Sequence, residues 1–402
     1  MMRTAAALSV AGQSELPFAK TPTKDAMRQR TDEASLTAKL RDVQWDFPER
    51  VAHSDIEGLH PYPAKFVAEL PRALLSILPI PTGTAVLDPF CGSGTTLVEC
   101  QRRAVPSFGI DLNPIACLMA RVKTTPASPG LAHSVSAVLA KARSIRDPSV
   151  PAIPNLDHWF MPNVQAALAR LTTAIAEANE LYRDILRLAL SSIIVRVSNQ
   201  DSDTRYAAVR KTVTSESVFA WFLRAAQRID GALSERRYPL SAATVIEADT
   251  LAVDPKRIPM PVGLVITSPP YPNAYEYWLY HKYRMWWLGF DPLAVKEREI
   301  GARAHFFKTN HHTAEDFTRQ MAETFRLLQK LVVPAGFACF VVGRSRIHGK
   351  IVDNAQVIEE VGRAAGFVLE FSTERVLSPS RKSFNLSHAN IKTETVLVLR
   401  YR

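Results

Sequence analysis

Two short segments carry residues whose types and spacing could hold a ligand and act on it. In the first, LDPFCGSGTT (87–96), Asp88 ends an apolar run and is followed by Gly92 and Gly94. Glycine lets a backbone turn sharply and approach a ligand closely, and the N–H groups that open the next helix are free to bind it. The carboxylate of Asp88 would repel a phosphate and favour a cationic group such as an ammonium. Asp111 ends the next apolar run, about 20 residues on, where an acid can accept hydrogen bonds from ribose hydroxyls.

The second segment ends an apolar run, GLVI (263–266), on a serine, two prolines and a tyrosine, Ser268, Pro269, Pro270 and Tyr271. Proline has a fixed φ and no N–H, so this backbone is rigid and offers carbonyl acceptors. The serine hydroxyl and a proline carbonyl can accept hydrogen bonds from an exocyclic amine, while the tyrosine ring can stack on a base. Taken singly, the two segments also fit an ordinary glycine turn and a proline-rich turn around a core tyrosine.

The elements that must position these segments follow from the spacing of apolar residues. Strand-like runs alternate with segments whose apolar residues recur every three or four positions, as in helices. This alternation predicts an α/β fold with a mostly parallel sheet covered on both faces, in which ligands bind at the carboxyl ends of the strands. Both segments lie at such ends. The predicted strands fall within 84–90, 106–113, 243–249, 263–266, 336–343, 367–376 and 393–401.

Helix signals are also local. Residues 66–78 have helical spacing with Pro71 in a first turn, where proline is tolerated. Residues 313–332 are amphipathic, with Thr313 as a suitable N-cap. Residues 351–366 predict a further helix that ends at a glycine.

Composition changes along the chain predict its organisation. Residues 1–45 are polar with no sustained apolar period, which predicts a partly disordered N-terminal arm. Residues 46–125 and 238–402 carry the strand–helix alternation and are expected to form two parts of one α/β domain. Residues 126–237 are largely helical in pattern and interrupt that alternation. We therefore interpret them as a helical insertion.

The whole chain favours an anionic partner and a reducing environment. Its formal charge is +10 over 402 residues, which suits nucleic acid but also fits an ordinary basic protein. Its four cysteines form no CxxC pair and have no metal-site spacing with histidine, so no metal site is expected. No apolar run approaches the roughly 20 residues that span a bilayer. The protein is expected to be cytoplasmic and associated with the nucleoid.

Together the two segments resemble the cofactor loop and catalytic tetrapeptide of the DNA amino-methyltransferases, which use S-adenosylmethionine to methylate N4 of cytosine or N6 of adenine. HPYPAKF (60–66) is similar to the segment that completes the family's cofactor pocket, GIDLNP (109–114) to its ribose-binding strand end, and IEAD (246–249) to the strand end that faces the adenine. The resemblance covers 51–122 and 243–401. It implies a class I methyltransferase with a Rossmann-like, doubly wound sheet.

The resemblance also assigns site residues. Ser268, Pro269, Pro270 and Tyr271 are the expected catalytic residues. The expected cofactor-binding residues are Tyr62, Pro63, Lys65, Asp88, Pro89, Phe90, Cys91, Gly92, Ser93, Gly94, Thr95, Thr96, Asp111, Leu112, Asn113, Asp249 and Thr267.

The form of the tetrapeptide favours cytosine as the target. Ser268 resembles the cytosine-N4 members more often than the adenine-N6 members, which stay an open alternative. The implied reaction is a direct displacement, in which a flipped base stacks on Tyr271 and its amine is held by Ser268 Oγ and the Pro269 carbonyl. There is no Pro-Cys pair, and Cys339 lies in a strand-like run, so a cysteine nucleophile is not expected.

Three other functions would share part of this pattern. A methyltransferase of the same fold acting on RNA or on a protein glutamine usually has Asn or Asp at the position of Ser268. A DNA-binding protein without activity would be expected to lose the glycine loop or the tetrapeptide. A nucleotide-dependent dehydrogenase would have GxGxxG where this chain has GSGTTL.

Double-stranded DNA is the expected partner, alone or beside a cognate restriction endonuclease, and the enzyme is expected to be a monomer or homodimer. The helical insertion is the candidate target-recognition region, because family members carry one as an insertion or appendage. Basic residues in three polar stretches can hold phosphates or read guanine, or can belong to an ordinary solvated surface. They are Arg205, Arg210 and Lys211, then Arg344 and Arg346, then Arg381 and Lys382.

Overall fold

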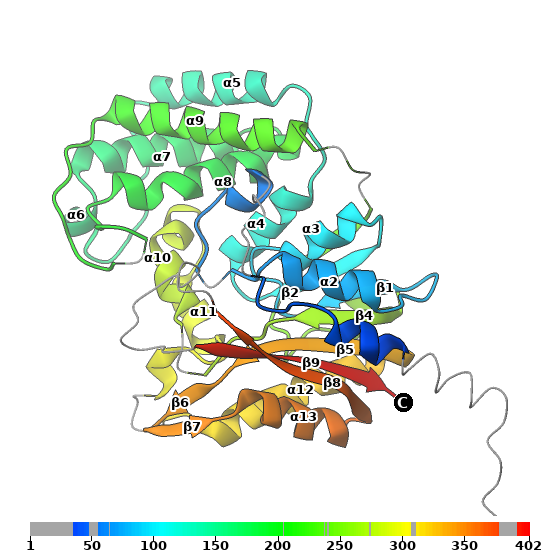
Figure 1. Cartoon of the computed structure of the whole chain (residues 1–402). Helices are drawn as coiled ribbons and strands as arrows, with labels where there is room; N and C mark the ends of the chain where they lie inside the picture. Colours follow the sequence, from blue (N-terminus) through cyan, green and yellow to red (C-terminus); the bar gives the residue numbers. More distant parts are fainter. Residues whose placement is uncertain are drawn as a thin grey trace, which may run out of the picture. The chain divides into compact units, whose positions relative to one another are not determined.

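The computed structural model describes residues 35–47, 55–63, 65–203, 205–236, 238, 241–272, 275–306, 311–377 and 392–402. The chain divides into two compact units, Met1–Asp42 and Val43–Arg402. Residues 35–41 of the first unit are helical, and most of the expected N-terminal arm, residues 1–34, lies outside the described residues. Every element discussed below belongs to the second unit (Figure 1).

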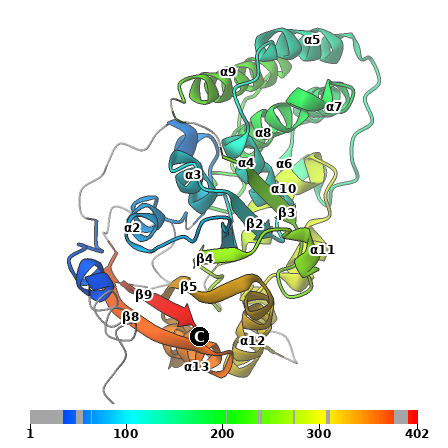
Figure 2. The ribbon, with the colours of Figure 1, turned by 90° about the vertical axis from the view of Figure 1, so that its right-hand side faces the viewer.

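Within the described ranges, seven strands form one sheet in the order β3-β2-β1-β4-β5-β9-β8. All neighbouring pairs are parallel except those made by β9, which is antiparallel to β5 and to β8. The strand order reverses between β1 and β4, so the chain winds outward from the centre on both sides (Figures 1 and 2). The predicted Rossmann-like class I methyltransferase fold is therefore confirmed. The strands of this sheet are β1 (Ala85–Asp88), β2 (Ser107–Asp111), β3 (Ala243–Glu247), β4 (Val262–Thr267), β5 (Val332–Gly343), β8 (Phe367–Val376) and β9 (Thr393–Tyr401).

The two central strands, β1 and β4, are buried at every residue. Parallel strands covered on both faces read as continuous apolar runs, which is why AVL and GLVI predict them. Leu87 of β1 is paired with Phe108 of β2 on one side and with Val265 of β4 on the other. The three carboxyl ends therefore meet at one edge of the sheet.

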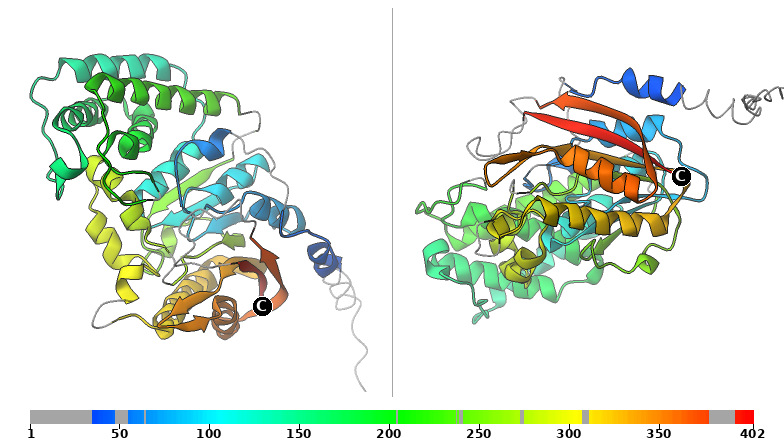
Figure 3. Two further views of the ribbon diagram at one scale, coloured as in Figure 1. Left: turned by 60° about the vertical axis from the view of Figure 1, so that its left-hand side comes forward. Right: turned by 90° about the horizontal axis from the view of Figure 1, so that it is seen from below.

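Helices cover both faces of the sheet. Figure 1 shows α2, α3 and α4 on one face and α12 and α13 on the other, and Figure 3 shows α12 and α13 from below. The second face is closed by a core in which Phe317, Met321 and Phe325 of α12 pack with Phe340 of β5 and Phe367 of β8. These helices are α2 (Glu69–Ile77), α3 (Thr95–Arg102), α4 (Pro114–Thr124), α12 (Ala314–Leu331) and α13 (Asn354–Ala364).

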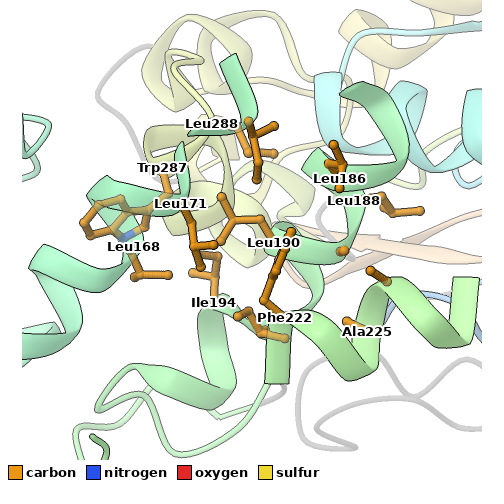
Figure 4. Packing of buried hydrophobic residues seen from close by; sticks show 14 of the residues in the cluster. Leu168, Leu171, Leu186, Leu188, Leu190, Ile194, Phe222, Ala225, Trp287 and Leu288 are labelled. Carbon is orange, nitrogen blue, oxygen red and sulfur yellow. The ribbon is translucent and has the colours of Figure 1, made fainter. Parts of the chain in front are cut away.

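A block of helices, five in the part of the chain that the structure describes, lies between α4 and β3, where the sequence predicts the insertion. Its core is continuous with buried residues of α4 and of the helix behind the tetrapeptide, α10 (Tyr277–Trp287). Trp287 packs among Leu168, Leu171 and Leu190 of the block (Figure 4). Burying such side chains contributes about 1.5–3 kcal/mol each, so the block and α10 stabilise one another. The block consists of α5 (Leu131–Ser144), α6 (Leu156–Trp159), α7 (Pro162–Ala176), α8 (Glu180–Val197) and α9 (Ser215–Ser234).

The local helix signals are confirmed, except that the helix predicted for 351–366 begins only at Asn354, because Lys350–Val352 form the strand β7. Pro71 lies in the first turn of α2. Thr313 caps α12, and its backbone N–H donates to the carboxylate of Asp316 in a capping box. Gly366, with φ +83°, follows the end of α13. No helix within the described ranges is long and apolar enough to cross a membrane.

The remaining elements are short. They are α11 (Pro292–Arg298), the two-stranded sheet of β6 (Ser345–Ile347) and β7 (Lys350–Val352), and three 3-10 helices, η1 (Asp55–Gly58), η2 (Pro255–Arg257) and η3 (Arg303–Phe306).

Candidate active site

The glycine loop (residues 87–96) and the tetrapeptide (residues 268–271) lie side by side, because β1 and β4 are neighbours in the sheet. Asp88 ends β1, and Thr267 ends β4 immediately before Ser268. The hydroxyl of Thr267 donates a 2.7 Å hydrogen bond to Asp88 Oδ1, and both side chains are buried. Thr267, predicted from the sequence as a cofactor-pocket residue, thus ties the acid of one segment to the other segment.

The glycine loop makes a tight turn in which two glycines have a left-handed backbone conformation. Gly92 and Gly94 have φ values of +48° and +83°, in the left-handed region that favours glycine. A Cβ on Gly94 would lie 2.8 Å from the Cα of Ala120 in α4, closer than atoms can approach. Gly94 is also the N-cap residue of α3 and has no side chain to bond the first N–H groups of that helix. The loop therefore presents open backbone donors at the carboxyl edge of the sheet.

Asp111 holds this loop from the end of β2. Its Oδ2 accepts from the N–H of Gly92 at 2.8 Å, and its Oδ1 accepts from the N–H of Asn113 at 2.8 Å. Asn113 in turn caps α4 through a 3.0 Å bond to the N–H of Ile115. Each carboxylate oxygen can accept two hydrogen bonds, so Asp111 keeps acceptor capacity for a ligand.

Both acids of the loop are held in a poorly hydrated environment. Desolvation raises the pKa of Asp88 to about 6, against the opposing hydrogen bonds from Thr96, Thr267 and the backbone. Desolvation also raises the pKa of Asp111 to about 6. A cationic or hydrogen-bond-donating ligand would favour the ionised carboxylates and relieve this cost.

The segment at 60–66 lies against the glycine loop. A Cβ on Gly92 would be 3.1 Å from the hydroxyl of Tyr62, so that ring rests on the loop. Tyr62 stacks on Tyr277 and His281 of α10, with ring centroids 5.7 Å and 5.5 Å away. It therefore bridges the glycine loop and the helix behind the tetrapeptide.

The other two predicted residues of this segment have different surroundings. Pro63 is buried. The ammonium of Lys65 donates to the carbonyl of Glu57, and desolvation lowers the pKa of Lys65 to about 8. The described contact of Lys65 is thus with the 3-10 helix η1 and not with the glycine loop.

The turn after β3 also reaches the glycine loop. The hydroxyl of Thr250 donates to the carbonyl of Pro89. The carboxylate of Asp249, one residue earlier, accepts the N–H of Leu251 at 3.0 Å and is half-buried. Phe90 packs against the core on the α12 face, and Cys91 is buried with its N–H bonded to the carbonyl of Ile110.

The tetrapeptide is partly covered. Ser268, Pro270 and Tyr271 are half-buried, and Pro269 is buried. The Tyr271 hydroxyl lies 3.4 Å from Ser268 Oγ and donates to Glu394 Oε1 at 3.0 Å.

The loop after α11 closes over the tetrapeptide's backbone. Gly301 has φ +73°, and a Cβ there would be 2.5 Å from the carbonyl oxygen of Tyr271, so only glycine allows this approach. Glu299 accepts the N–H groups of Tyr277 and Trp278 at 2.9 and 2.7 Å, and desolvation raises its pKa to about 8. The start of α10 is thereby fixed behind the tetrapeptide.

Several supporting residues escape prediction from the sequence. Lys123 is fully buried, and its ammonium lies 3.2 Å from Ser93 Oγ in the glycine loop and 3.5 Å from Glu57 Oε2. Its signal is weak but visible: a lone lysine near the end of the apolar helix PIACLMARVKT. Glu394 and Glu299 lie far from the tetrapeptide in the chain and carry no local signal.

The first group of expected DNA contacts lies in the loop between α8 and α9. Arg205 and Arg210 are exposed, and Arg205 lies 4.0 Å from Asp201. The Lys211 ammonium is instead bonded to the carbonyls of Val195 and Gln200 and holds the loop to the end of α8.

This loop is anchored on α10. The hydroxyls of Tyr206 and Tyr283 are 2.6 Å apart, and Asp203 is paired with the buried Arg284. The Lys282 ammonium lies 4.1 Å from the centre of the Tyr206 ring. Loop and helix thus present cations and an exposed aromatic ring on one surface.

The other two groups of expected DNA contacts are not brought to this loop by any described interaction. Arg344 is paired with Glu374 at 2.8 Å and lies 3.5 Å from Asp353. Arg346 lies in β6 and approaches the carbonyl of Gly349 at 3.4 Å. Arg381 and Lys382 lie outside the described residues.

The remaining chemistry of the site is limited. Within the described ranges no group of three or more His, Cys, Asp or Glu side chains could hold a metal ion. Cys339 is buried in β5, and desolvation raises the pKa of its thiol above the ordinary value, so it stays protonated at neutral pH. Thiolate attack from Cys339 is therefore disfavoured.

Similarity to known proteins agrees with this geometry. A family model described as DNA methylase, N6_N4_Mtase, matches residues 11–121. The type II methyltransferase M.MjaII of Methanocaldococcus jannaschii is 44% identical over 75 residues, which are 19% of this chain and 14% of that protein. The type II methyltransferase M.MvaI of Kocuria varians is 25% identical over 242 residues, 54% of this chain and 53% of that protein. This chain thus spans about half or less of these relatives.

Among solved structures, the rRNA methyltransferase aviRa of Streptomyces viridochromogenes has 14% sequence identity and a TM-score of 0.34, covering 88% of this chain and 94% of that one. The sequence matches support the predicted resemblance to the S-adenosylmethionine-dependent DNA amino-methyltransferases, a group whose name spans both N6 and N4 methylation.

Proposed function

We propose that this protein transfers a methyl group from S-adenosylmethionine to the exocyclic amine of a base in double-stranded DNA. The observation that carries the proposal is the Thr267–Asp88 hydrogen bond of 2.7 Å, which sets the glycine loop beside Ser268. A ligand held in the loop would therefore lie next to the group that receives the amine. The similarity to type II methyltransferases supports DNA as the substrate.

The described residues fit this cofactor. Gly92 and Gly94 leave a cradle that a Cβ would fill. The buried amide nitrogen Nδ2 of Asn113 and the buried hydroxyl of Thr95 have no hydrogen-bond partner among the described residues and can serve a ligand. Asp111 has acceptor capacity for ribose hydroxyls. Asp88 is the acid for the ammonium of the amino acid moiety.

When bound, the cofactor supplies an electrophilic methyl group on a sulfonium. The chain's own residues position the amine. Ser268 Oγ and the Pro269 carbonyl accept hydrogen bonds from the two N–H groups of the amine, which directs the nitrogen lone pair away from these acceptors. Tyr271 stacks on the flipped base. No strong base is needed, because the proton can leave after the transfer. Positioning and a matched electrostatic environment supply most of the rate.

Cytosine N4 is the proposed target atom. The tetrapeptide begins with Ser268, the form that resembles the cytosine-N4 members more often. Adenine N6 presents the same aromatic amine to the same acceptors and is the alternative.

The helical insertion, residues 126–237, is the proposed recognition region. Its loop from 199 to 211 presents Arg205 and Arg210 to solvent beside the half-buried Lys282 of α10. Cations at such a surface neutralise phosphates. The anchoring on α10 makes this surface continuous with the helix behind the tetrapeptide.

One experiment tests the whole proposal. The protein is expressed in a host that lacks DNA methylation, and the DNA is sequenced by a method that reports modified bases, with Ser268→Ala expressed in parallel. Methylated cytosine N4 at one sequence motif, absent with Ser268→Ala, is the expected result. Methylated adenine N6 would correct the base. Unmodified DNA from a protein that binds S-adenosylmethionine would refute DNA as the substrate.

A further inference from the structure

A chain of buried and partly buried hydrogen bonds runs from the tetrapeptide to the far strands of the sheet. The Tyr271 hydroxyl donates to Glu394 Oε1 at 3.0 Å, and Glu394 Oε2 accepts from Arg375 Nη1 at 3.0 Å. The Nε of Arg375 then donates to the carbonyl of Trp45 at 3.0 Å. The Arg375 side chain is 1% exposed and the Glu394 side chain 16% exposed. Neither of these two charged residues has a place in the reaction described above.

The backbone fixes this chain at each end. Arg375 of β8 and Glu394 of β9 are directly opposite one another in the antiparallel ladder, and Glu394 is also opposite Gly343 at the end of β5. Their separation is thus set by the sheet and not by flexible side chains alone. The carbonyl of Val341 in β5 lies 3.4 Å from the Tyr271 hydroxyl. The tyrosine is held by the sheet that also carries the catalytic strand end.

Enclosing two charges in this place is costly for the fold. A buried ion pair often stabilises a protein less than apolar residues of similar size would. Stability alone therefore gives little reason for a largely buried Arg–Glu pair at the carboxyl edge of the sheet. A hydrogen bond to an ionised carboxylate is, however, stronger and more directional than one to a neutral acceptor. The pair is well suited to orient the hydroxyl that it contacts.

We propose that Glu394, supported by Arg375, is a positioning residue that fixes the ring of Tyr271 for stacking on the target base. This inference rests on the proposed function. With the hydroxyl bonded, the ring keeps one plane, so the amine arrives at Ser268 in one orientation. Without the carboxylate the ring would sample several orientations, and few of them would align the amine with the methyl group.

The test is a double-mutant cycle on the rate of methyl transfer. Single-turnover rates are measured on a duplex containing the motif identified by sequencing, with S-adenosylmethionine affinity measured separately by calorimetry. Glu394→Leu should slow transfer about tenfold with unchanged cofactor affinity, whereas Glu394→Gln, which keeps an acceptor, should slow it about threefold or less. In a Tyr271→Phe background, Glu394→Leu should add no further loss. An equal loss in both backgrounds would overturn the proposal.

The fold provides a matched control. Glu370 of β8 is paired with Arg400 of β9 at 3.8 Å, joining the same two strands with no described contact to Tyr271. Glu370→Leu should leave the transfer rate unchanged; a tenfold loss there would mean that any break in these strands suffices and would overturn the specific role of Glu394. If Glu394→Leu does not fold because Arg375 is left unpaired, the double variant Arg375→Met, Glu394→Leu removes both charges and should fold while still transferring slowly.

A second readout is independent of activity. In protein labelled with 13Cζ-tyrosine, the Tyr271 resonance is assigned by its disappearance in Tyr271→Phe. It should shift in Glu394→Leu and stay in place in Glu370→Leu. If the resonance does not move in Glu394→Leu, the Tyr271–Glu394 hydrogen bond is absent in solution and the proposal is refuted. A resonance that shifts as expected, in a protein whose wild-type form methylates no DNA, would instead refute the proposed function.

Discussion

The glycine loop and the loop from 199 to 211 are held in opposite ways. The glycine loop turns its polar groups inward, where Asp111, Lys123 and Thr250 bond its backbone or side chains. The loop from 199 to 211 is tied down at Asp203 and Lys211 but leaves Arg205, Tyr206 and Arg210 exposed.

This difference matches the ligands that we propose for each. A small ligand is held by enclosing it, so its site needs fixed backbone and buried acids. A polyanion is met at a surface, so cations there must stay solvated and accessible. The helix α10 is linked to the glycine loop through Tyr62, which stacks on Tyr277 and His281, and it contacts the loop from 199 to 211 through Tyr283. The two ligands would therefore be bound on either side of one rigid element.

We call the glycine loop and the adjoining tetrapeptide the enclosed region, and the loop from 199 to 211 with α10 the exposed region. In the enclosed region, Ser268→Ala should have the largest effect. Removal of the hydroxyl takes away one acceptor for the amine and should lower the rate of methyl transfer about 100-fold or more. Affinity for S-adenosylmethionine, measured by calorimetry, should stay within about twofold. Ser144→Ala, on an exposed hydroxyl of α5 that bonds the carbonyl of Lys141, is the control. A parallel fall in cofactor affinity would place Ser268 in the cofactor pocket instead.

The next test asks whether close packing, and not backbone conformation alone, defines the glycine loop. Gly94 and Gly289 have nearly equal φ values, +83° and +81°, but a Cβ meets Ala120 at 2.8 Å in the first case and nothing within 4 Å in the second. Alanine at either position carries the same left-handed strain, about 1 kcal/mol. Gly94→Ala should lower the free energy of unfolding by about 2 kcal/mol more than Gly289→Ala in urea denaturation. Equal decreases would show that the loop tolerates a side chain.

The residues of the enclosed region are easier to predict from the sequence than those of the exposed region. Asp88, Gly92 and Gly94 act within one turn, and Ser268 to Tyr271 are contiguous, so their chemistry is confined to short segments. The central strands are also predictable, because a fully buried strand needs an unbroken apolar run.

Interactions that depend on the assembled sheet could not be predicted from the sequence. The Tyr271–Glu394 hydrogen bond joins residues 123 positions apart, and Lys123 meets Ser93 only because α4 packs on the loop. Lys211 illustrates the same point from the other side. Its sequence neighbours suggest a DNA contact, while its ammonium bonds two carbonyls of its own loop and helix.

A third test measures how cofactor affinity at the glycine loop depends on pH. Desolvation raises the pKa of Asp88 and Asp111 to about 6, above the ordinary value of about 3.9 for an unfolded chain. The ligand-free fold therefore favours the protonated acids, and their contribution to stability is lost as pH rises through about 6. A cofactor that needs the ionised acids should bind more weakly below that pH, by about tenfold per pH unit for each proton that the acids must release on binding. Calorimetry from pH 5 to 8 measures this, and Asp111→Asn should make the profile less steep by one proton, leaving the contribution of Asp88. A flat wild-type profile would exclude ionised acids from binding.

The smallest expected effect concerns the exposed region. Arg210→Gln and Lys282→Gln should each weaken binding to duplex DNA a few-fold at moderate salt. Each should also reduce the slope of log K against log salt by about 0.9 for every phosphate that the variant no longer neutralises. Lys282 has a pKa lowered to about 8 by desolvation, so it is still mostly charged at pH 7. Fluorescence anisotropy with a labelled duplex over a series of salt concentrations measures both quantities.

The control for these variants is Lys141→Gln, on α5 and paired with Glu177, which gives the background for removing one positive charge. Arg210 and Lys282 have no described bond to the glycine loop, so cofactor affinity should not change in either variant. If both variants bind DNA with the wild-type salt slope, the loop and α10 are not the DNA surface. The DNA-binding surface would then have to be sought elsewhere on the insertion. A surface that binds a polyanion must carry cations, and removing one of them changes the number of counterions released on binding.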